Sequence, residues 1–161
     1  MIRNVNIADV KQLAEIYNYY VKNSTATFDD VQLSLKAFEE KMLRISKYFP
    51  FLVFEEDNKI LGYAYGSKWR PKPAYNHTVE STVYVKHNEH GKQIGTKLYT
   101  ELLKHLKQQK FHTVIGGLTL PNEASVRLHK KFGFKEVAHF KQVGFKFNEW
   151  LDVGFWQLNL D

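Results

Sequence analysis

The sequence predicts an α/β fold in which β-strands and amphipathic helices follow one another along 161 residues. In the middle of the chain, a run of β-formers from Thr82 to Val85 precedes a polar turn that contains Gly91 and Gly95. Apolar residues then recur at helical spacing, at Ile94, Leu98, Leu102 and Leu106. A second strand and helix follow this unit. The length fits one domain, residues 1–161, with a core of its own.

The N-terminal half predicts a short strand from Ile2 to Val5 and a helix with Asp9 in its first turn. The apolar side of that helix carries Val10, Leu13, Ile16, Tyr17 and Tyr20. A second amphipathic helix is expected from Leu35 to Tyr48, ended by Pro50. Residues 51–55 and 60–67 then read as a β-hairpin around the turn at 57–59. Gly62 and Gly66, both in its second strand, predict bulges.

The C-terminal half predicts a strand from Phe111 to Leu120, ended by Pro121, and a helix from Asn122 to Phe132 with Gly133 at its C′ position. The paired glycines Gly116 and Gly117 favour a bulge or a close backbone approach within that strand. Residues 134–143 and 151–160 read as the last two strands. They and the segment between them are rich in aromatic residues: Phe145, Phe147, Trp150, Phe155 and Trp156. This apolar surface beyond the needs of one core favours a homodimer.

The composition excludes several kinds of chemistry. The chain has no cysteine, so it has no disulfide framework, no thiolate metal site and no cysteine nucleophile. No apolar run is long enough to span a membrane, and the first residues lack the apolar stretch of a signal peptide. We therefore expect a protein of the cytoplasm without a membrane partner.

The net charge of +6 is compatible with an anionic partner: a nucleic acid, a membrane surface or a polyanionic cofactor. Many lysines, however, stand beside acidic residues, as Lys36 does beside Glu39 and Glu40. This pattern favours a solvated surface over a stripe that binds nucleic acid. We expect no nucleic-acid partner.

The turn between Val85 and Ile94 suits a phosphate. Such a turn directs successive backbone N–H groups at one point and adds the positive end of the following helix. Many glycine turns before helices bind nothing, so the turn alone leaves both interpretations open.

Three stretches of the sequence resemble a known family. These are E-S-T-V-Y-V at residues 80–85, R-L-H-K-K-F-G-F at 127–134 and W-L-D-V-G-F-W-Q-L at 150–158. Together with Asn122 and Ser125 they resemble the GCN5-related N-acetyltransferases, and among them the phosphinothricin and methionine sulfoximine acetyltransferases. The resemblance covers essentially the whole chain.

The resemblance implies the GNAT fold: a single mixed, mostly antiparallel central sheet, splayed between two strands and flanked by helices. It also implies a reaction, in which acetyl passes from acetyl-CoA to the primary amine of a small amino acid or analogue. The amine would attack directly in a ternary complex, and no metal is required.

The resemblance assigns the cofactor to two segments. Backbone N–H groups of Val83, Tyr84 and Val85 would stabilise the thioester oxygen, and Asn122 and Ser125 would hold the pantetheine arm. The pyrophosphate would lie on Gly91, Lys92, Gln93, Ile94, Gly95 and Thr96. Lys92 is equally compatible with a solvated side chain, and Asn122 with a helix N-cap. Gln93 stands where a glycine is common, so an unstrained turn requires an ordinary negative φ there.

Two residues are candidates for proton transfer. Glu80 is an acid in a β-forming run, and burial would bring its pKa toward that of a general base. Its other interpretation is a rim carboxylate or a structural ion pair. His129 stands where many related enzymes carry a tyrosine general acid, so the resemblance gives it the role of protonating the thiolate. A histidine on a helix is otherwise a surface or packing residue.

The acceptor site is expected to include Phe28, Arg70, Lys72, Tyr75 and Thr82. Phe28 is an aromatic in a polar loop and either anchors that loop or forms a wall of the pocket. Arg70 and Lys72 lie in a stiff loop with two prolines, where they form either a clamp for an anionic group or an ordinary basic surface. Their order is swapped relative to the family pattern, so the charge is kept but arginine and lysine exchange positions.

Two other functions remain open from the sequence. The same chemistry could act on a protein N-terminus, a lysine or a polyamine, which would need an open groove. A basic module that binds nucleic acid or senses CoA without turnover is the alternative from a different class, and it would bind nucleic acid in a salt-dependent manner.

Overall fold

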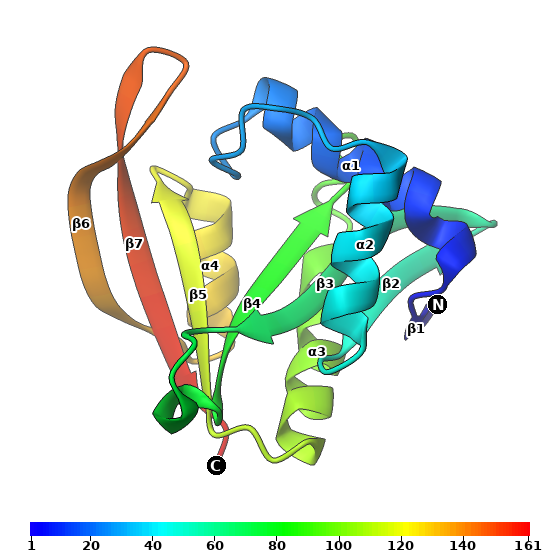
Figure 1. Cartoon of the computed structure of the whole chain (residues 1–161). Helices are drawn as coiled ribbons and strands as arrows, with labels where there is room; N and C mark the ends of the chain where they lie inside the picture. The colour runs from blue at the N-terminus through cyan, green and yellow to red at the C-terminus, as the bar shows by residue number, and fades with distance from the viewer.

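A seven-stranded sheet lies between two layers of helices in the computed structural model, which describes residues 1–161 (Figure 1). The strands are β1 Ile2–Asn4, β2 Phe51–Glu56, β3 Lys59–Lys68, β4 Thr78–Val85, β5 Thr113–Leu120, β6 Lys135–Lys146 and β7 Glu149–Asn159. The α-helices are α1 Val10–Asn23, α2 Leu35–Ser46, α3 Ile94–Gln108 and α4 Glu123–Lys131, and two 3₁₀ turns are η1 Ile7–Asp9 and η2 Pro73–Tyr75. The expected mixed α/β sheet flanked by helices is confirmed.

The sheet has the order β1-β2-β3-β4-β5-β7-β6, and its neighbours are antiparallel except for β4 and β5. The parallel pair is very short: only Thr78–Glu80 of β4 pair with Thr113–Ile115 of β5. Beyond this point the two strands diverge, as the open V in the centre of Figure 1 shows. The predicted splay between two central strands is therefore present.

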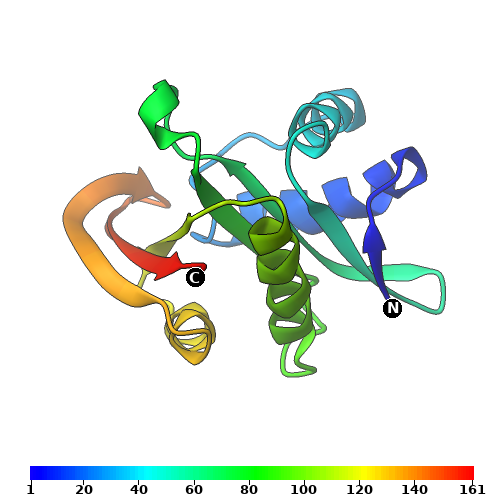
Figure 2. The same ribbon diagram turned by 90° about the horizontal axis from the view of Figure 1, so that it is seen from below.

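Each face of the sheet carries its own core. Helices α1 and α2 pack on one face, where residues such as Leu13, Phe38 and Tyr63 are buried together. Helix α3 packs on the other face with Leu98, Leu102 and Val79. Figure 2 shows this layering, with the sheet between α1 and α2 on one side and α3 and α4 on the other. The strand alternation of β4 thus directs neighbouring residues into different cores.

The predicted hairpin at residues 51–67 forms as β2 and β3, joined by Asp57 and Asn58 in left-handed conformations. The pairing register shifts beside Gly62, where Phe54 pairs with Gly62 and Glu55 with Ile60. The bulge expected at Gly66 is wrong, because Gly66 pairs regularly with Ser81. A Cβ there would lie 3.1 Å from Leu106, so the glycine allows α3 to approach.

The paired glycines of β5 also lie in regular pairing with β7, at Trp156 and Phe155. Of the two expectations for these glycines, a bulge or a close backbone approach, the second is therefore the correct one. A Cβ on Gly116 would lie 2.8 Å from Cδ2 of His129, and one on Gly117 would lie 3.0 Å from Phe155. Gly133, predicted at C′ after the last full helix, has the expected positive φ of 86°.

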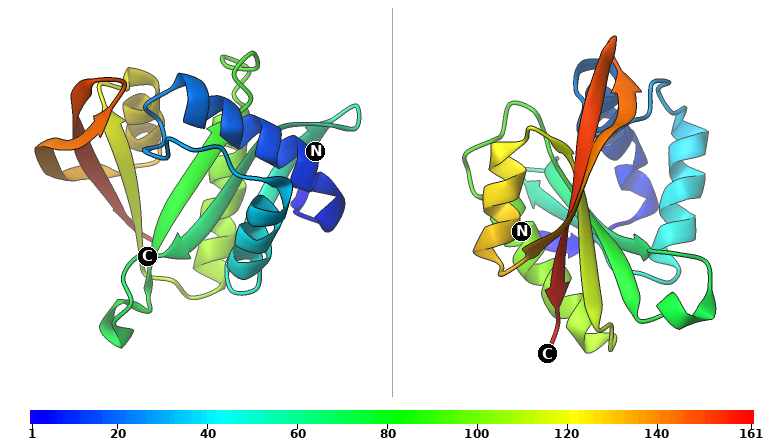
Figure 3. Two further views of the ribbon diagram at one scale, coloured as in Figure 1. Left: turned by 45° about the horizontal axis from the view of Figure 1, so that its top comes forward. Right: turned by 90° about the vertical axis from the view of Figure 1, so that its left-hand side faces the viewer.

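The C-terminal hairpin is longer than the predicted strands. β6 extends to Lys146 because two register shifts, after Glu136 and after Phe140, absorb extra residues without ending the strand. The turn at Phe147 and Asn148 is left-handed at both positions. Figure 3 shows that the tip of this hairpin stands beside the segment that joins α1 to α2. No helix of the chain has the length and apolarity that a membrane span requires.

Candidate active site

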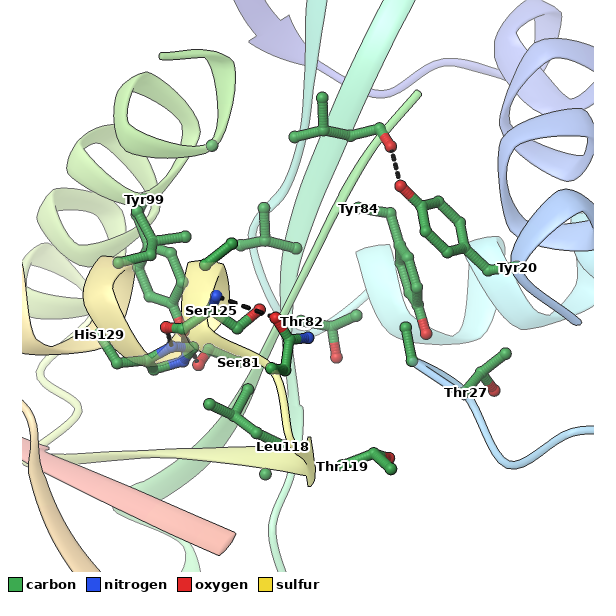
Figure 4. A pocket seen from close by; sticks show the side chains of 18 of the residues that line it. Tyr20, Thr27, Ser81, Thr82, Tyr84, Tyr99, Leu118, Thr119, Ser125 and His129 are labelled. Atoms are coloured by element: carbon green, nitrogen blue, oxygen red, sulfur yellow. Dashed lines mark hydrogen bonds between the residues drawn. The ribbon is translucent and has the colours of Figure 1, made fainter. Parts of the chain in front are cut away.

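A cavity of about 650 Å³ occupies the gap between the diverging strands β4 and β5. It is lined by five parts of the chain: the segment from Tyr20 to Phe28, β4 with the turn that follows it, the first turns of α3, parts of β5 and β7, and α4 with its N-cap. Figure 4 shows side chains from these elements converging on one space. The site is thus built where the sheet itself opens.

Neighbouring residues of β4 present different groups to this cavity. Tyr84 packs with the α1–α2 core, and Glu80 and Thr82 share its face by alternation. Ser81 faces the other way, toward α3, where it bonds to Tyr99. The expected base and the expected backbone site therefore lie on the same strand, on the β4 side of the gap.

The inner edge of β4 carries unpaired backbone groups. The Lys86 N–H bonds to the Leu61 carbonyl of β3 at 2.8 Å, so alternation directs the N–H groups of Val83 and Val85 away from β3 and into the gap. The N–H of Tyr84 is directed to β3, which leaves two of the three expected donors facing the gap. The Tyr20 hydroxyl from α1 donates to the Val85 carbonyl on the same edge.

The turn after β4 is shaped for an anion. Gly91 and Gln93 both have left-handed conformations, with φ of 85° and 61°. The expectation of a negative φ at Gln93 is wrong: Gln93 is the N-cap of α3 and takes the left-handed conformation that a glycine would supply there. No side chain caps α3, so the N–H groups of Ile94, Gly95 and Thr96 have no intrahelical partner and remain available.

Lys92 lies at the same turn but outside the cavity lining. Its ammonium pairs with Glu89 at 2.5 Å on the exposed surface. The Tyr20 hydroxyl, which donates to Val85, also lies 2.9 Å from Nε2 of His90. Because a hydroxyl has one proton, His90 is the donor in that second bond. Tyr20 thereby joins α1 to the phosphate turn.

Asn122 is the N-cap of α4, as one of its two interpretations predicted, and its Oδ1 accepts from the Ser125 N–H at 3.1 Å. The side-chain NH₂ of Asn122 remains free to donate into the cavity, which both Asn122 and Ser125 line. The capping role and a contact with a bound amide are therefore compatible.

His129 is buried, with 5% of its surface exposed, and both ring nitrogens are engaged. Nδ1 lies 2.7 Å from the Ser125 carbonyl and must donate to it. Nε2 then accepts from the Tyr99 hydroxyl at 2.9 Å, because burial lowers the pKa of His129 and keeps the ring neutral. Tyr99 in turn accepts from Ser81 at 2.5 Å. His129 is thus the end of a buried chain, whose members Figure 4 shows on its left-hand side.

Glu80 is half-buried at the point where β4 and β5 separate. Its Oε1 lies 3.5 Å from the position of a Cβ on Gly117, so the carboxyl group points across the gap at β5. Burial raises the pKa of Glu80, and the positive charge of Arg70 partly offsets that rise. A carboxylate with a raised pKa in a cavity has the properties of a general base.

Phe28 and Thr82 line the cavity, as expected for acceptor residues. Arg70, Lys72 and Tyr75 do not: Arg70 stacks on Trp69 at 4.3 Å, and the other two lie on the exposed turn around η2. No lysine or arginine lines the cavity. Of the two cations of the predicted clamp, only Arg70 is close enough to lower the pKa of Glu80.

Several lining residues were missed by sequence reasoning. Tyr20 and Tyr99 read as apolar positions of amphipathic helices, and only their hydroxyl groups distinguish them from core residues. A tyrosine at a position that leucine would fill is the signal that could have found them, because a buried hydroxyl needs a partner. Leu118, Thr119 and Phe155 line the cavity because β4 and β5 separate, which no local pattern reveals.

A splayed sheet with an uncapped helix at its open edge defines an acyl-CoA-dependent transferase, and comparison with known proteins agrees. The family model described as "Acetyltransferase (GNAT) domain" matches residues 2–154, and the chain belongs to this family. The family resemblance predicted from the sequence is confirmed. The protein is an N-acetyltransferase, and acetyl-CoA is its acetyl donor.

Similar proteins cover nearly the whole chain. A phosphinothricin N-acetyltransferase of Streptomyces viridochromogenes is 36% identical over 99% of this chain and 87% of its own length. An L-methionine sulfoximine/L-methionine sulfone acetyltransferase of Pseudomonas paraeruginosa is 35% identical over 99% and 94%. The crystal structure of a phosphinothricin acetyltransferase from Sinorhizobium meliloti in complex with acetyl-CoA has a TM-score of 0.96, with 30% identity over 99% of this chain and 87% of that one.

Proposed function

We propose that this acetyltransferase transfers acetyl to the primary amine of a small amino acid or amino-acid analogue, of the phosphinothricin and methionine sulfoximine type. The observation that carries the proposal is the position of Glu80, a half-buried carboxylate with a raised pKa that points across the gap between β4 and β5. The names of the two relatives support the class of acceptor.

Acetyl-CoA fits the open edge of the sheet. The unpaired N–H groups of Val83 and Val85 would bind its thioester and pantetheine amides, and Asn122 and Ser125 would complete that contact. The uncapped start of α3, with Gly91 and Gln93, would hold the pyrophosphate. The cofactor supplies the activated acetyl group.

Catalysis then requires the ammonium nitrogen to lose two protons, one before it attacks and one to solvent as the amide forms, while the thiolate gains one. Glu80, directly or through a water, accepts the proton of the ammonium group, which makes the nitrogen nucleophilic. The Val83 and Val85 N–H groups stabilise the oxyanion that forms when the amine attacks the thioester carbon. Both reactants are held together on β4, so the transfer is direct.

The thiolate would receive its proton from the chain that ends at His129. The Tyr99 hydroxyl, which lines the cavity, would give its proton to the thiolate as the C–S bond breaks and would recover one from solvent in the open cavity. Neutral His129 has its only N–H committed to the Ser125 carbonyl and gives no proton itself. In this proposal His129 orients the Tyr99 hydroxyl, and the hydroxyl groups of Tyr99 and Ser81 lie between it and the cavity.

The acceptor would contact Phe28 and Thr82 inside the cavity. Arg70 would attract its carboxylate or phosphinate near Glu80, which its charge already reaches. Lys72 and Tyr75 lie further along the same loop, and single alanine variants test whether they take part.

Thiol release from acetyl-CoA tests the proposal against a panel of amines: phosphinothricin, methionine sulfoximine, methionine sulfone, the common amino acids, polyamines and a short peptide. We expect turnover on the sulfoximine, the sulfone or phosphinothricin. Turnover on the peptide or a polyamine alone would replace the acceptor class. No turnover with any amine, in a protein that binds acetyl-CoA, would contradict the proposal.

A homodimer in the cytoplasm completes the proposal. The β6–β7 hairpin exposes a set of large apolar side chains, namely Val137, Phe140, Val143, Phe145, Phe147 and Trp150. A second copy of the chain would cover them. Sedimentation equilibrium of the wild type and of Trp150→Asp tests this: we expect a dimer and a monomer respectively, and a wild-type monomer at micromolar concentration would exclude it. Cell fractionation tests the location.

A further inference from the structure

Lys146 is an unusual lysine in this chain because it is buried, with 5% of its surface exposed. It lies at the end of β6, next to the turn of the hairpin. Its ammonium donates to two backbone carbonyls, Ser24 at 2.7 Å and Thr27 at 2.8 Å. More than a hundred residues separate these partners in sequence, so the contact ties two distant parts of the fold together.

The carbonyl groups belong to residues 24–30, which we call the 24–30 loop. This segment has no helix or strand of its own. It supplies Ala26, Thr27 and Phe28 to the lining of the cavity. A loop without regular structure needs contacts from outside to hold three lining residues in place.

One side of the loop is held by α1. The Tyr17 hydroxyl donates to the Asp29 carboxylate, and the side chain of Asn18 bonds to Leu33 beyond the loop. Helix α1 packs on the part of the sheet that contains β3 and β4. These contacts attach the loop to one arm of the opened sheet.

The other side is held by the hairpin, which continues the opposite arm through β5 and β7. Besides Lys146, this contact includes Gly144, which is buried against the Phe28 ring. A Cβ on Gly144 would overlap that ring, so the absence of a side chain makes the space that Phe28 occupies. Figure 3 shows the loop and the hairpin side by side from two directions.

We propose that Lys146 and Gly144 form a latch that holds the 24–30 loop across the two arms of the sheet and thereby fixes the wall of the acceptor site. Lys146 is a positioning residue in this proposal, acting through the loop on the acceptor and not on acetyl-CoA. Only the ammonium group of Lys146 bonds to the two carbonyls, so a variant can keep the aliphatic part of the side chain and lose the donors alone. The expected effect of the latch on the acceptor rests on the proposed function. The expected effect on the order of the 24–30 loop does not.

The first test compares Lys146→Met, which keeps the stem and removes the two donors, with Lys135→Met. Lys135 is exposed at the other end of the same strand, and its side chain makes no hydrogen bond or ion pair. Hydrogen exchange followed by mass spectrometry is measured on peptides that cover the 24–30 loop. We expect exchange in the loop to be at least about tenfold faster in Lys146→Met and unchanged in Lys135→Met. Unchanged exchange in both variants would overturn the latch.

The second test measures kinetics with the acceptor that the panel identifies. We expect Lys146→Met to raise the acceptor KM about tenfold or more while the Kd for CoA, measured by calorimetry, changes less than about twofold. Lys146→Arg keeps charged hydrogen-bond donors, so its acceptor KM should lie close to that of the wild type. Equal losses for acceptor and CoA, with faster exchange throughout the chain, would show a general loss of stability and overturn the proposal.

A second variant keeps the proposal testable if Lys146→Met does not fold. Gly144→Ala displaces Phe28 without touching the charge, and we expect it to raise the acceptor KM in the same direction, with a melting temperature close to that of the wild type. A folded Gly144→Ala protein with a wild-type acceptor KM would contradict the role of the contact. If the wild type acetylates no amine of the panel, the proposed function fails, and the exchange comparison alone still decides whether the latch exists.

Discussion

The Tyr99 hydroxyl lies 2.9 Å from Nε2 of His129, and the imidazole can only accept this hydrogen bond because its other nitrogen donates to the Ser125 carbonyl. Three elements meet in this contact: α3 provides the tyrosine, α4 the histidine and β4 the serine that completes the chain. A buried chain of this kind must keep every member satisfied, since one missing partner leaves a polar group without a bond.

Tyr99→Phe removes the middle of that chain. We expect a loss of about 1–3 kcal/mol in the free energy of unfolding, because Nε2 of His129 loses its partner and Ser81 keeps only the longer contact of 3.4 Å with the Ile115 carbonyl. If the chain also delivers the proton to the thiolate, kcat should fall while the Kd for CoA stays near that of the wild type. Denaturant unfolding and steady-state kinetics measure both, with Tyr48→Phe at an exposed tyrosine as the control. A fully active variant would exclude the chain from catalysis.

Glu80→Gln is expected to change activity and stability in opposite directions. Burial raises the pKa of Glu80, so the base is lost as pH falls through a value above that of an exposed glutamate. We expect wild-type activity to decline on this acidic side, and Glu80→Gln to lose about 10²- to 10⁴-fold of kcat.

The same substitution should raise the melting temperature near pH 7. The folded state binds the Glu80 proton more tightly than the unfolded chain, so this group favours folding at low pH and opposes it once both states are ionised. Removing the charge eliminates that cost at pH 7 and changes little at pH 4. A melting temperature that falls equally at both pH values would contradict the assigned shift.

Substitutions of Gln93 test the left-handed conformation at the N-cap of α3. We expect Gln93→Gly to be as stable as the wild type or slightly more so, and Gln93→Val to lose about 1–2 kcal/mol, since a β-branched residue is poorly tolerated at positive φ. A residue with a negative φ would show the opposite order, because glycine is then the less stable choice. Thermal unfolding of the two variants decides between these conformations.

Asp9 is buried, and Arg3 binds it with two hydrogen bonds of 2.8 and 2.9 Å. Burial opposes its ionisation, but the bonds from Arg3 and from the Asn6 N–H prevail and hold its pKa below the ordinary value. Its contribution to stability is therefore present above the unfolded pKa of about 3.9 and is lost as pH falls below it.

Arg3→Met should cost about 1–3 kcal/mol at pH 7, because the buried carboxylate loses both bonds from Arg3 and keeps only the bond from the Asn6 N–H. Arg3 also bonds to Glu55 at 2.6 Å, so part of this loss belongs to that second pair. The difference between the variant and the wild type should shrink below about pH 4, which unfolding curves across pH will measure. A difference independent of pH would show that packing and not charge is responsible.

Much of the fold could be predicted from local patterns. The amphipathic spacing of Ile94 to Leu106 gave α3 correctly, and Gly133 marked the end of α4. The prediction failed where pairing between distant strands decides the outcome. Gly66 lies in a regular ladder because α3 packs against it, and β6 continues beyond Val143 because two bulges keep it paired with β7.

The candidate site shows the same limit. Glu80, Phe28 and Asn122 were found because the family resemblance favoured a functional interpretation of each, and all three line one cavity. Tyr20, Tyr99 and Lys146 were not found, since each looks ordinary in its own element and acquires its role from a partner 30 or more positions away. The cationic loop was placed by analogy, and its exposed position on η2 depends on how β3 turns into β4.

A sheet ordinarily has two edges, but this one has four, because β4 and β5 part after three pairs. The two inner edges are held open by the folded chain itself and cannot be satisfied by any strand it contains. Acetyl-CoA, whose pantetheine arm carries two amides, therefore acts partly as a component of the architecture and not only as a reagent. Binding of acetyl-CoA to these edges would stabilise the folded chain, so the melting temperature should rise with acetyl-CoA concentration.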